Sequence, residues 1–266
     1  MAAKLFSSQG FRTWLQVLGL IAGAAFMILI ILGYPYAVHA LCPYATICFG
    51  ISKSVLLGLT SVMFGITVAI GIGILIHSIF YGRKFCGYLC PLGTWQEAIF
   101  SFRSRKYRSR HRIPYIYEKR FARLKYWLLL LTSLLSLGGV AYIYIRLCPL
   151  FALSLLPRLA IPGLVVFLLI SIVAAFTERL WCRWLCPYAA LMNIFQYLGA
   201  WFGIKRRKIH RNLERCVDCG ICMIYCPMNL NIAEDEYVQS PECVHCLVCA
   251  SKCPKPGTFC CEKENE

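Results

Sequence analysis

Two segments near the C-terminal end carry cysteines at the same spacing, C-x2-C-x2-C-x3-C-P, and this repeated spacing strongly constrains the fold. The segments read CVDCGICMIYCP, at 216–227, and CVHCLVCASKCP, at 243–254. Three closely spaced thiolates fit three irons of a [4Fe-4S] cubane, and the fourth, before proline, reaches across to the other cluster. The spacing predicts two [4Fe-4S] clusters, with these ligand sets: Cys216, Cys219, Cys222 and Cys253; Cys243, Cys246, Cys249 and Cys226.

Other cofactors fit this cysteine pattern less well. C-x2-C pairs also bind zinc tetrahedrally, but two complete copies with proline in register favour clusters. A bis-histidine haem is excluded, because His77 is the only histidine inside an apolar stretch. We therefore predict a small α+β dicluster ferredoxin module at 211–266, which passes single electrons.

Long apolar stretches dominate the rest of the chain. The mean hydropathy is +0.63, and the stretches at 14–32, 55–80, 126–145 and 162–176 contain no acidic or basic residue. The first three meet the ~20 residues that are needed to cross a bilayer. The first is also longer than the ~7–15 apolar residues of a cleaved signal. The pattern predicts four transmembrane helices.

The charge distribution predicts how these helices are oriented. Residues 1–213 hold 24 basic and three acidic side chains, whereas residues 214–266 hold four basic and nine acidic ones. Basic residues cluster in the 83–125 loop, and positive loops stay in the cytoplasm. The expected location is the inner membrane, multi-pass and in contact with membrane lipid, with both termini cytoplasmic. The segment RSRKYRSRHR is interpreted as this topological signal, so no nucleic-acid partner is expected.

The chain also contains an internal repeat. RKFCGYLCPLGTW at 83–95 is echoed by ERLWCRWLCPYAA at 178–190, and ALCPYATI at 40–47 is echoed by RLCPLFAL at 146–153. Each unit is expected to contain an outward helix, an outer turn, a returning helix and an inner cysteine pair. The predicted fold class is an all-α integral membrane protein at 1–210, built as a parallel two-helix repeat, with the ferredoxin module behind it. Amphipathic segments at 92–102 and 188–202 are expected to be interfacial helices, although 188–202 could instead be a fifth span.

The inner cysteine pairs raise a separate question of chemistry. In an α-helical turn, Cys86 and Cys90 lie on one face, and so do Cys182 and Cys186. The repeat then brings all four thiols to one side of the protein. They could form one redox metal site, two dithiol–disulfide couples, or plain packing. A disulfide couple takes two electrons and a cubane takes one, so a metal site matches the ferredoxin module better.

The ordered combination of four apolar helices, CGYLCP, CRWLCP and a double ferredoxin motif resembles the NapH-type polyferredoxins. That family also includes the membrane halves of NosR and the CcoG/RdxA oxidase-assembly proteins. The resemblance implies an electron-transfer subunit that oxidises a quinol and passes the electrons to a protein redox partner. A copper-reducing assembly factor resembling CcoG and a redox sensor without turnover are the alternatives.

Quinol oxidation releases two protons, so the site needs titratable side chains. Glu97, Glu178 and His77 are the candidates near the inner cysteines. The turns at Cys42 and Cys148, and the nearby Cys48, do not belong to the motif that carries the resemblance, so they receive no role.

Overall fold

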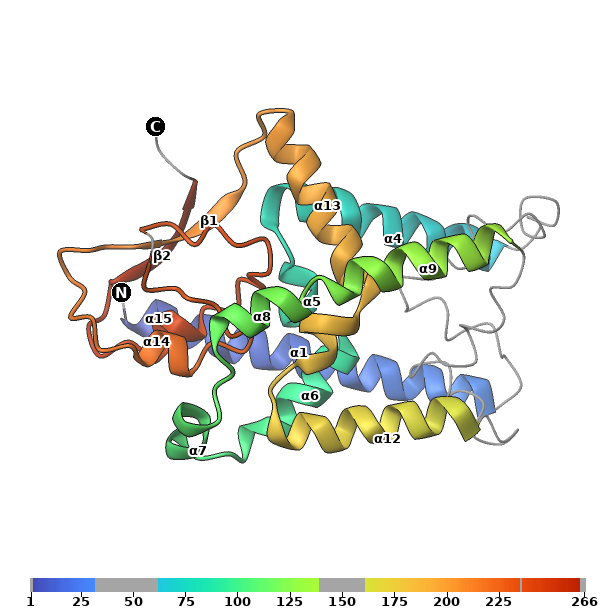
Figure 1. Ribbon diagram of the computed structural model, residues 1–266, viewed down its shortest axis with the longest axis horizontal. Coiled ribbons are helices and arrows are strands. Elements are labelled where there is room, and N and C mark those ends of the chain that lie inside the picture. The colour runs from blue at the N-terminus through green and yellow to red at the C-terminus, as the bar shows by residue number, and fades with distance from the viewer. Residues whose placement is uncertain (1, 32–61, 139–160, 235, 264–266) are drawn as a thin grey trace.

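The computed structural model describes residues 2–31, 62–138, 161–234 and 236–263, which are mostly helical with one small sheet (Figure 1). Cys42, Cys48, Cys148 and the outer turns predicted around them lie outside the described residues. The longer helices are α1 (Ala2–Ile31), α4 (Val62–Tyr81), α6 (Pro91–Ser101), α9 (Leu124–Leu137), α12 (Ile161–Phe176) and α13 (Pro187–Trp201). The shorter ones are α5 (Lys84–Tyr88), α7 (Arg105–Arg110), α8 (Tyr115–Phe121), the π-helix η3 (Trp181–Leu185), α14 (Ile221–Ile224) and α15 (Val248–Ser251).

The longer helices form two groups, and each group contains helices from both repeats. Helix α6 packs against α1 and α12, and α13 packs against α4 and α9. In Figure 1 the first group lies low and the second lies high. Helix α6 follows the first cysteine pair and contacts α12, which precedes the second pair. Likewise, α13 follows the second cysteine pair and contacts α4, which precedes the first pair. Gly199 permits this close approach, because a Cβ there would lie 2.5 Å from Cγ2 of Ile79.

The prediction of four transmembrane helices is wrong. Within the described ranges, no helix combines the length and the apolar character that crossing a membrane demands. Helix α9 has 14 residues and α12 has 16, whereas a span needs ~20. An apolar run in a sequence does not show at which residue its helix ends, and α9 ends at Leu137, inside the run at 126–145. The segments at 92–102 and 188–202 are helical, as α6 and α13, and Asn193 and Gln196 of α13 are buried. The interfacial placement of these helices stays a prediction.

The C-terminal residues form a compact end of the molecule, on the left in Figure 1, where both chain ends also lie. Strand β1 (Arg207–Arg211) pairs antiparallel with β2 (Phe259–Lys263), so that His210 lies opposite Cys260. Strand β1 crosses the boundary predicted at 210/211, and the domain division itself stays a prediction. Buried Val244 belongs to the same hydrophobic cluster as Met192 of α13. The ferredoxin end is therefore packed onto the helices.

Candidate functional site

Both inner cysteine pairs fold into the same turn. Cys90 and Cys186 are extended, at φ −67°, ψ 114° and φ −70°, ψ 111°, and each precedes a proline that begins a long helix. Proline disfavours the helical conformation in the residue before it and is well suited to a first helical turn. The amide of Cys90 donates to Phe85 O at 3.2 Å, and the amide of Cys186 donates to Trp181 O at 2.8 Å. The predicted α-helical turn is thus wrong in detail, because the turn is wider and its second cysteine is extended.

The four inner thiols share one site. All four are free, with Cys86 and Cys182 buried and the other two half-buried. Burial raises the pKa of Cys90, and negative charge on the other three thiols raises it further. Burial likewise raises the pKa of Cys186, with added effects from Cys182 and Cys86. Hydrogen bonds from Arg83 to Cys182 O and from Arg179 to Cys86 O place the two pairs together.

Two buried arginines link the pairs reciprocally. Arg83 and Arg179 each lie three residues before the first cysteine of a pair, and both side chains are fully buried. Nη2 of Arg83 donates to Cys182 O at 3.0 Å, while Nη1 of Arg179 donates to Cys86 O at 2.6 Å. Each arginine therefore binds the cysteine turn of the other repeat, which fixes the two turns relative to each other.

Each of these arginines shares a carboxylate with a second cation. Glu97 pairs with Arg179 at 2.5 Å and with Arg12 at 2.6 Å, and Glu242 pairs with Arg83 and Lys125. Each group holds two positive charges and one negative charge, so a net positive charge of two surrounds the four thiols. The Nε atom of Arg83 is buried and has no hydrogen-bond partner among the described residues. A buried excess of positive charge needs compensation, and a negatively charged thiolate site supplies it.

These residues fit a cluster better than a single metal ion. Across the described ranges, no three histidine, cysteine or acidic side chains gather tightly enough to hold one ion. The thiolates of a cubane each bind a different iron, so they stand farther apart than the ligands of one ion. A [4Fe-4S] cluster requires four neighbouring thiolates. The buried arginines balance the negative charge of these four.

The two ferredoxin motifs adopt matching loops. Asp218 and Gly220 in the first motif, and His245 and Leu247 in the second, have positive φ values of 47°, 68°, 51° and 56°. In each motif the third and fifth residues adopt the left-handed conformation, so the loop turns tightly before a short helix, α14 or α15. The thiols differ in exposure, because Cys219 is exposed while the second motif buries Cys243, Cys246 and Cys249.

The fourth cysteine of the first motif lies with the second motif. Burial raises the pKa of Cys226, and Cys246 raises it further. Burial also raises the pKa of Cys249, followed by the effects of Cys246, Cys243 and Cys226. The structure therefore brings Cys226 to the three thiols with which the sequence groups it.

The second motif contacts the first inner cysteine turn. The hydroxyl of Tyr88 donates to His245 O at 3.3 Å. A Cβ on Gly87 would lie 2.5 Å from Val244 O, so the loop and the turn touch through backbone atoms. Only glycine fits there without a shift, so the second motif lies directly against the first inner turn.

The three predicted proton acceptors have different surroundings. Burial would raise the pKa of Glu97, but Arg179 and Arg12 outweigh burial and hold it below its ordinary value, which makes Glu97 a weak base. His77 is exposed on α4 and stacks on Tyr81 with ring centroids 4.6 Å apart. Burial and Lys84 lower the pKa of His77. Only Glu178 combines burial with a pKa near neutrality.

We expect Glu178 to exchange a proton near pH 7. Burial raises its pKa to about 7, although the cation of Arg108, whose Nη1 lies 2.7 Å away, opposes the shift. Because the folded state binds this proton more tightly than the unfolded state, its contribution to stability falls as the pH rises from about 4.5 to about 7. Infrared spectra should show a protonated carboxyl band that disappears as the pH rises through about 7 and is missing in Glu178→Gln. A band that persists in the variant would assign the proton elsewhere.

Several residues of this site were not predicted from the sequence. Arg83, Arg179, Lys125 and Glu242 lie around the inner thiols, yet the charge pattern of the sequence indicates only a topological role for Arg83 and Lys125. One signal was available, since an arginine stands three residues before the first cysteine in both RKFCGYLCP and RLWCRWLCP. Glu242 has no such signal, because its partners are far away in the sequence.

Comparison with protein families assigns cofactors to both parts of the site. A family model described as a 4Fe-4S binding domain matches residues 62–110 and 159–209, which include both inner cysteine pairs. A model described as a 4Fe-4S dicluster domain matches residues 208–254. The chain is therefore an iron–sulfur protein with 4Fe-4S ferredoxin domains.

Its relatives point to electron transport. The chain is 28% identical over 71% of its length to YccM of Escherichia coli, which is named for electron transport, and 28% identical over 68% to the uncharacterized protein MJ0750 of Methanocaldococcus jannaschii. It is 29% identical over 65% of its length to the regulatory protein NosR of Stutzerimonas stutzeri. These alignments cover 53%, 73% and 25% of the respective relatives, so the chain spans about half of YccM. No solved structure matches the chain.

These domains and relatives support the expected iron–sulfur electron-transfer role. The resemblance to NosR is confirmed, whereas the narrower assignment to the NapH type stays a prediction.

Proposed function

We propose that the chain is an electron-transfer subunit that oxidises a quinol, with a third [4Fe-4S] cluster held by Cys86, Cys90, Cys182 and Cys186. The match of a 4Fe-4S binding model to both cysteine pairs supports this proposal. The convergence of the four thiols and the surplus of buried cations support it too. When bound, the clusters supply one-electron transfer.

The contact between the second ferredoxin motif and the first inner turn is the observation on which the proposal depends. Gly87 and Val244 join the inner turn to the second motif, so electrons would pass from the inner thiols through the second motif to the first. This path would end at Cys219, which is exposed beside the exposed side chains of Leu213 and Val217. A protein redox partner would dock at this exposed end, and the electron donor at the buried end.

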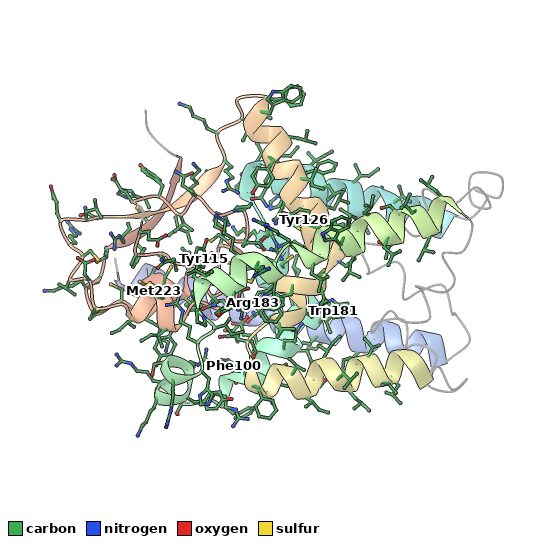
Figure 2. The ribbon with its side chains drawn as sticks, viewed as in Figure 1. Phe100, Tyr115, Tyr126, Trp181, Arg183 and Met223 are labelled. Carbon is green, nitrogen blue, oxygen red and sulfur yellow. The ribbon has the colours of Figure 1, made fainter. Side chains whose placement is uncertain are left out.

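A cavity between α8, α13 and residues 228–242 would accept an aromatic donor. Its volume is about 380 Å³, and Tyr115, Tyr126, Met228 and Arg183 are among its lining residues. Figure 2 places Tyr115, Tyr126 and Arg183 between the ferredoxin end and the long helices. The aromatic and apolar side chains would pack against a quinol ring.

Proton-exchanging groups adjoin this cavity. The hydroxyl of Tyr126 accepts from Asn193 at 3.1 Å, so its own proton is available to a bound ligand. Arg183 also lines a smaller neighbouring cavity that contains Glu178. Glu178, with its pKa of about 7, would accept a proton that leaves the quinol.

Iron analysis tests the inner cluster. We expect about twelve irons per wild-type chain and about eight in Cys86→Ser or Cys182→Ser, because each variant removes one ligand of the inner cubane. Cys260→Ser, which changes a cysteine of strand β2 outside all three sets, should keep the wild-type content. A wild-type chain with only about eight irons would overturn the third cluster.

Reduction assays test the donor. A quinol should bleach the cluster absorbance of the wild-type protein anaerobically. Reduction of cupric ion in place of quinol oxidation would favour an assembly factor instead, and neither activity would favour a sensor.

A further inference from the structure

The two repeats can be compared position by position beside the four inner thiols. Cys86 and Cys90 correspond to Cys182 and Cys186, 96 positions further along the chain. At the same offset, Gln96 corresponds to Met192, and each lies against the first cysteine of the other repeat. Nε2 of Gln96 is 3.7 Å from Sγ of Cys182, and Sδ of Met192 is 3.7 Å from Sγ of Cys86. The next pair breaks the symmetry, because Glu97 corresponds to Asn193.

In one half, the carboxylate comes from the repeat itself. Glu97 of α6 binds Arg179, and its side chain is 19% exposed. Its carboxylate also binds Arg12. The cation that holds the Cys86 carbonyl therefore has a counter-ion on the adjoining helix.

In the other half, the carboxylate comes from the ferredoxin end. Asn193 carries no charge, but its Nδ2 donates to Oε1 of Glu242 at 2.7 Å. Glu242 binds Arg83 and Lys125, whose side chains are fully buried, and is itself 18% exposed. Glu242 thus occupies the place in the second half that Glu97 occupies in the first.

Glu242 directly precedes Cys243, the first cysteine of the second motif. Its contacts therefore tie that motif to the arginine that holds the Cys182 carbonyl. We propose that Glu242 is a positioning residue that replaces the carboxylate missing at position 193, setting the reduction potential of the four-cysteine site and fastening the second motif against it. This proposal rests on the proposed occupation of the inner site by a cluster.

The potential of the inner site provides the first measurement. In Glu242→Gln, Arg83 and Lys125 lose their counter-ion, so EPR-monitored redox titration should show a more positive reduction potential for the inner cluster. Adding Asn193→Glu to this variant returns a carboxylate to the repeat-equivalent position, and the potential should shift back. Glu214→Gln, which removes an exposed carboxylate of the same module, should leave the potential unchanged.

Hydrogen exchange provides the second measurement. The backbone amides at 243–249 should exchange roughly tenfold faster in Glu242→Gln than in wild type, because a buried ion pair is lost. If this variant does not accumulate, Glu242→Asp should still show faster exchange, since its shorter carboxylate cannot reach both cations.

The outcomes separate this proposal from the proposed function. An unchanged potential in Glu242→Gln, or no recovery on adding Asn193→Glu, overturns the positioning role while the iron content still supports the cluster. Unchanged exchange in both Glu242 variants overturns the fastening role. A wild-type iron content of about eight overturns the inner cluster itself, and the exchange rates still decide whether Glu242 fastens the module.

Discussion

Arg179→Met is expected to lower the free energy of unfolding by about 3–5 kcal/mol, the usual cost of removing one partner of a buried ion pair. The guanidinium is fully buried, binds Glu97 at 2.5 Å and donates to Cys86 O at 2.6 Å. Methionine fills similar space but leaves Glu97 with Arg12 as its one remaining cation among the described residues. Arg179 also has a φ of 51°, and holding a non-glycine residue there costs about 1–2 kcal/mol. The fold therefore retains this arginine against a backbone penalty.

Denaturant titration followed by far-UV circular dichroism and by cluster absorbance would measure this loss. The comparison is between midpoints of anaerobically prepared samples, because cofactor-containing proteins do not always unfold in two states. Arg105→Met is the matched control, since Arg105 is an exposed residue of α7. Equal midpoints for Arg179→Met and the wild type would show that Arg179 does not hold the two cysteine turns together.

Local sequence patterns predicted the parts of the site that depend on residues close in the chain. The proline after each inner pair correctly indicates the start of a helix, at α6 and α13. The same prolines force Cys90 and Cys186 into extended conformations, and the assumption of an α-helical turn overlooked this effect. The identity of the cysteines was therefore predictable, but the shape of their turn was predicted only in part.

Contacts between distant residues account for what the sequence could not show. Glu97 is one of the proton acceptors predicted from the sequence, yet it is enclosed by Arg12 and Arg179, which are 85 and 82 positions away. Nothing near Glu97 in the sequence reveals those cations. Glu178 has only Arg179 and Arg183 as nearby cations in sequence, but it pairs with Arg108 instead. Proton affinities at this site depend on tertiary neighbours.

The membrane prediction failed for a related reason. Apolar composition measures how much of a segment avoids water, but it does not distinguish a lipid-facing helix from a short helix packed in a protein. Helix α9 ends at Leu137, well inside the apolar run at 126–145, and buries Thr132 and Ser136. Helix ends and burial of this kind are set by neighbouring elements.

Gly87→Ala is expected to separate the second ferredoxin motif from the inner thiols. A Cβ on residue 87 would lie 2.5 Å from Val244 O and 3.4 Å from Val244 Cβ. Because the nearest atom belongs to the backbone, a side-chain rotation cannot relieve the clash, and the loop or the turn must move. Overpacking of this kind costs about 1–3 kcal/mol, and the hydrogen bond from Tyr88 to His245 would be lost with it.

Gly87→Ala should change the coupling between the inner and second-motif clusters rather than the iron content of the protein. Each cysteine set keeps its ligands in Gly87→Ala, so the iron content should match the wild type, while magnetic coupling between the inner and second-motif clusters weakens and quinol-driven bleaching of the ferredoxin module slows. Gly10→Ala is the matched control: Gly10 lies in helix α1 with nothing within 4 Å of a new Cβ, and alanine there should add about 0.5–1 kcal/mol of stability. The two substitutions add the same methyl group to a helix and should act in opposite directions. The quinol-driven bleaching of the ferredoxin module could instead be as fast in Gly87→Ala as in Gly10→Ala. The contact between Gly87 and Val244 would then not be the route between the inner cysteines and the ferredoxin module, because breaking that contact would not slow electron transfer.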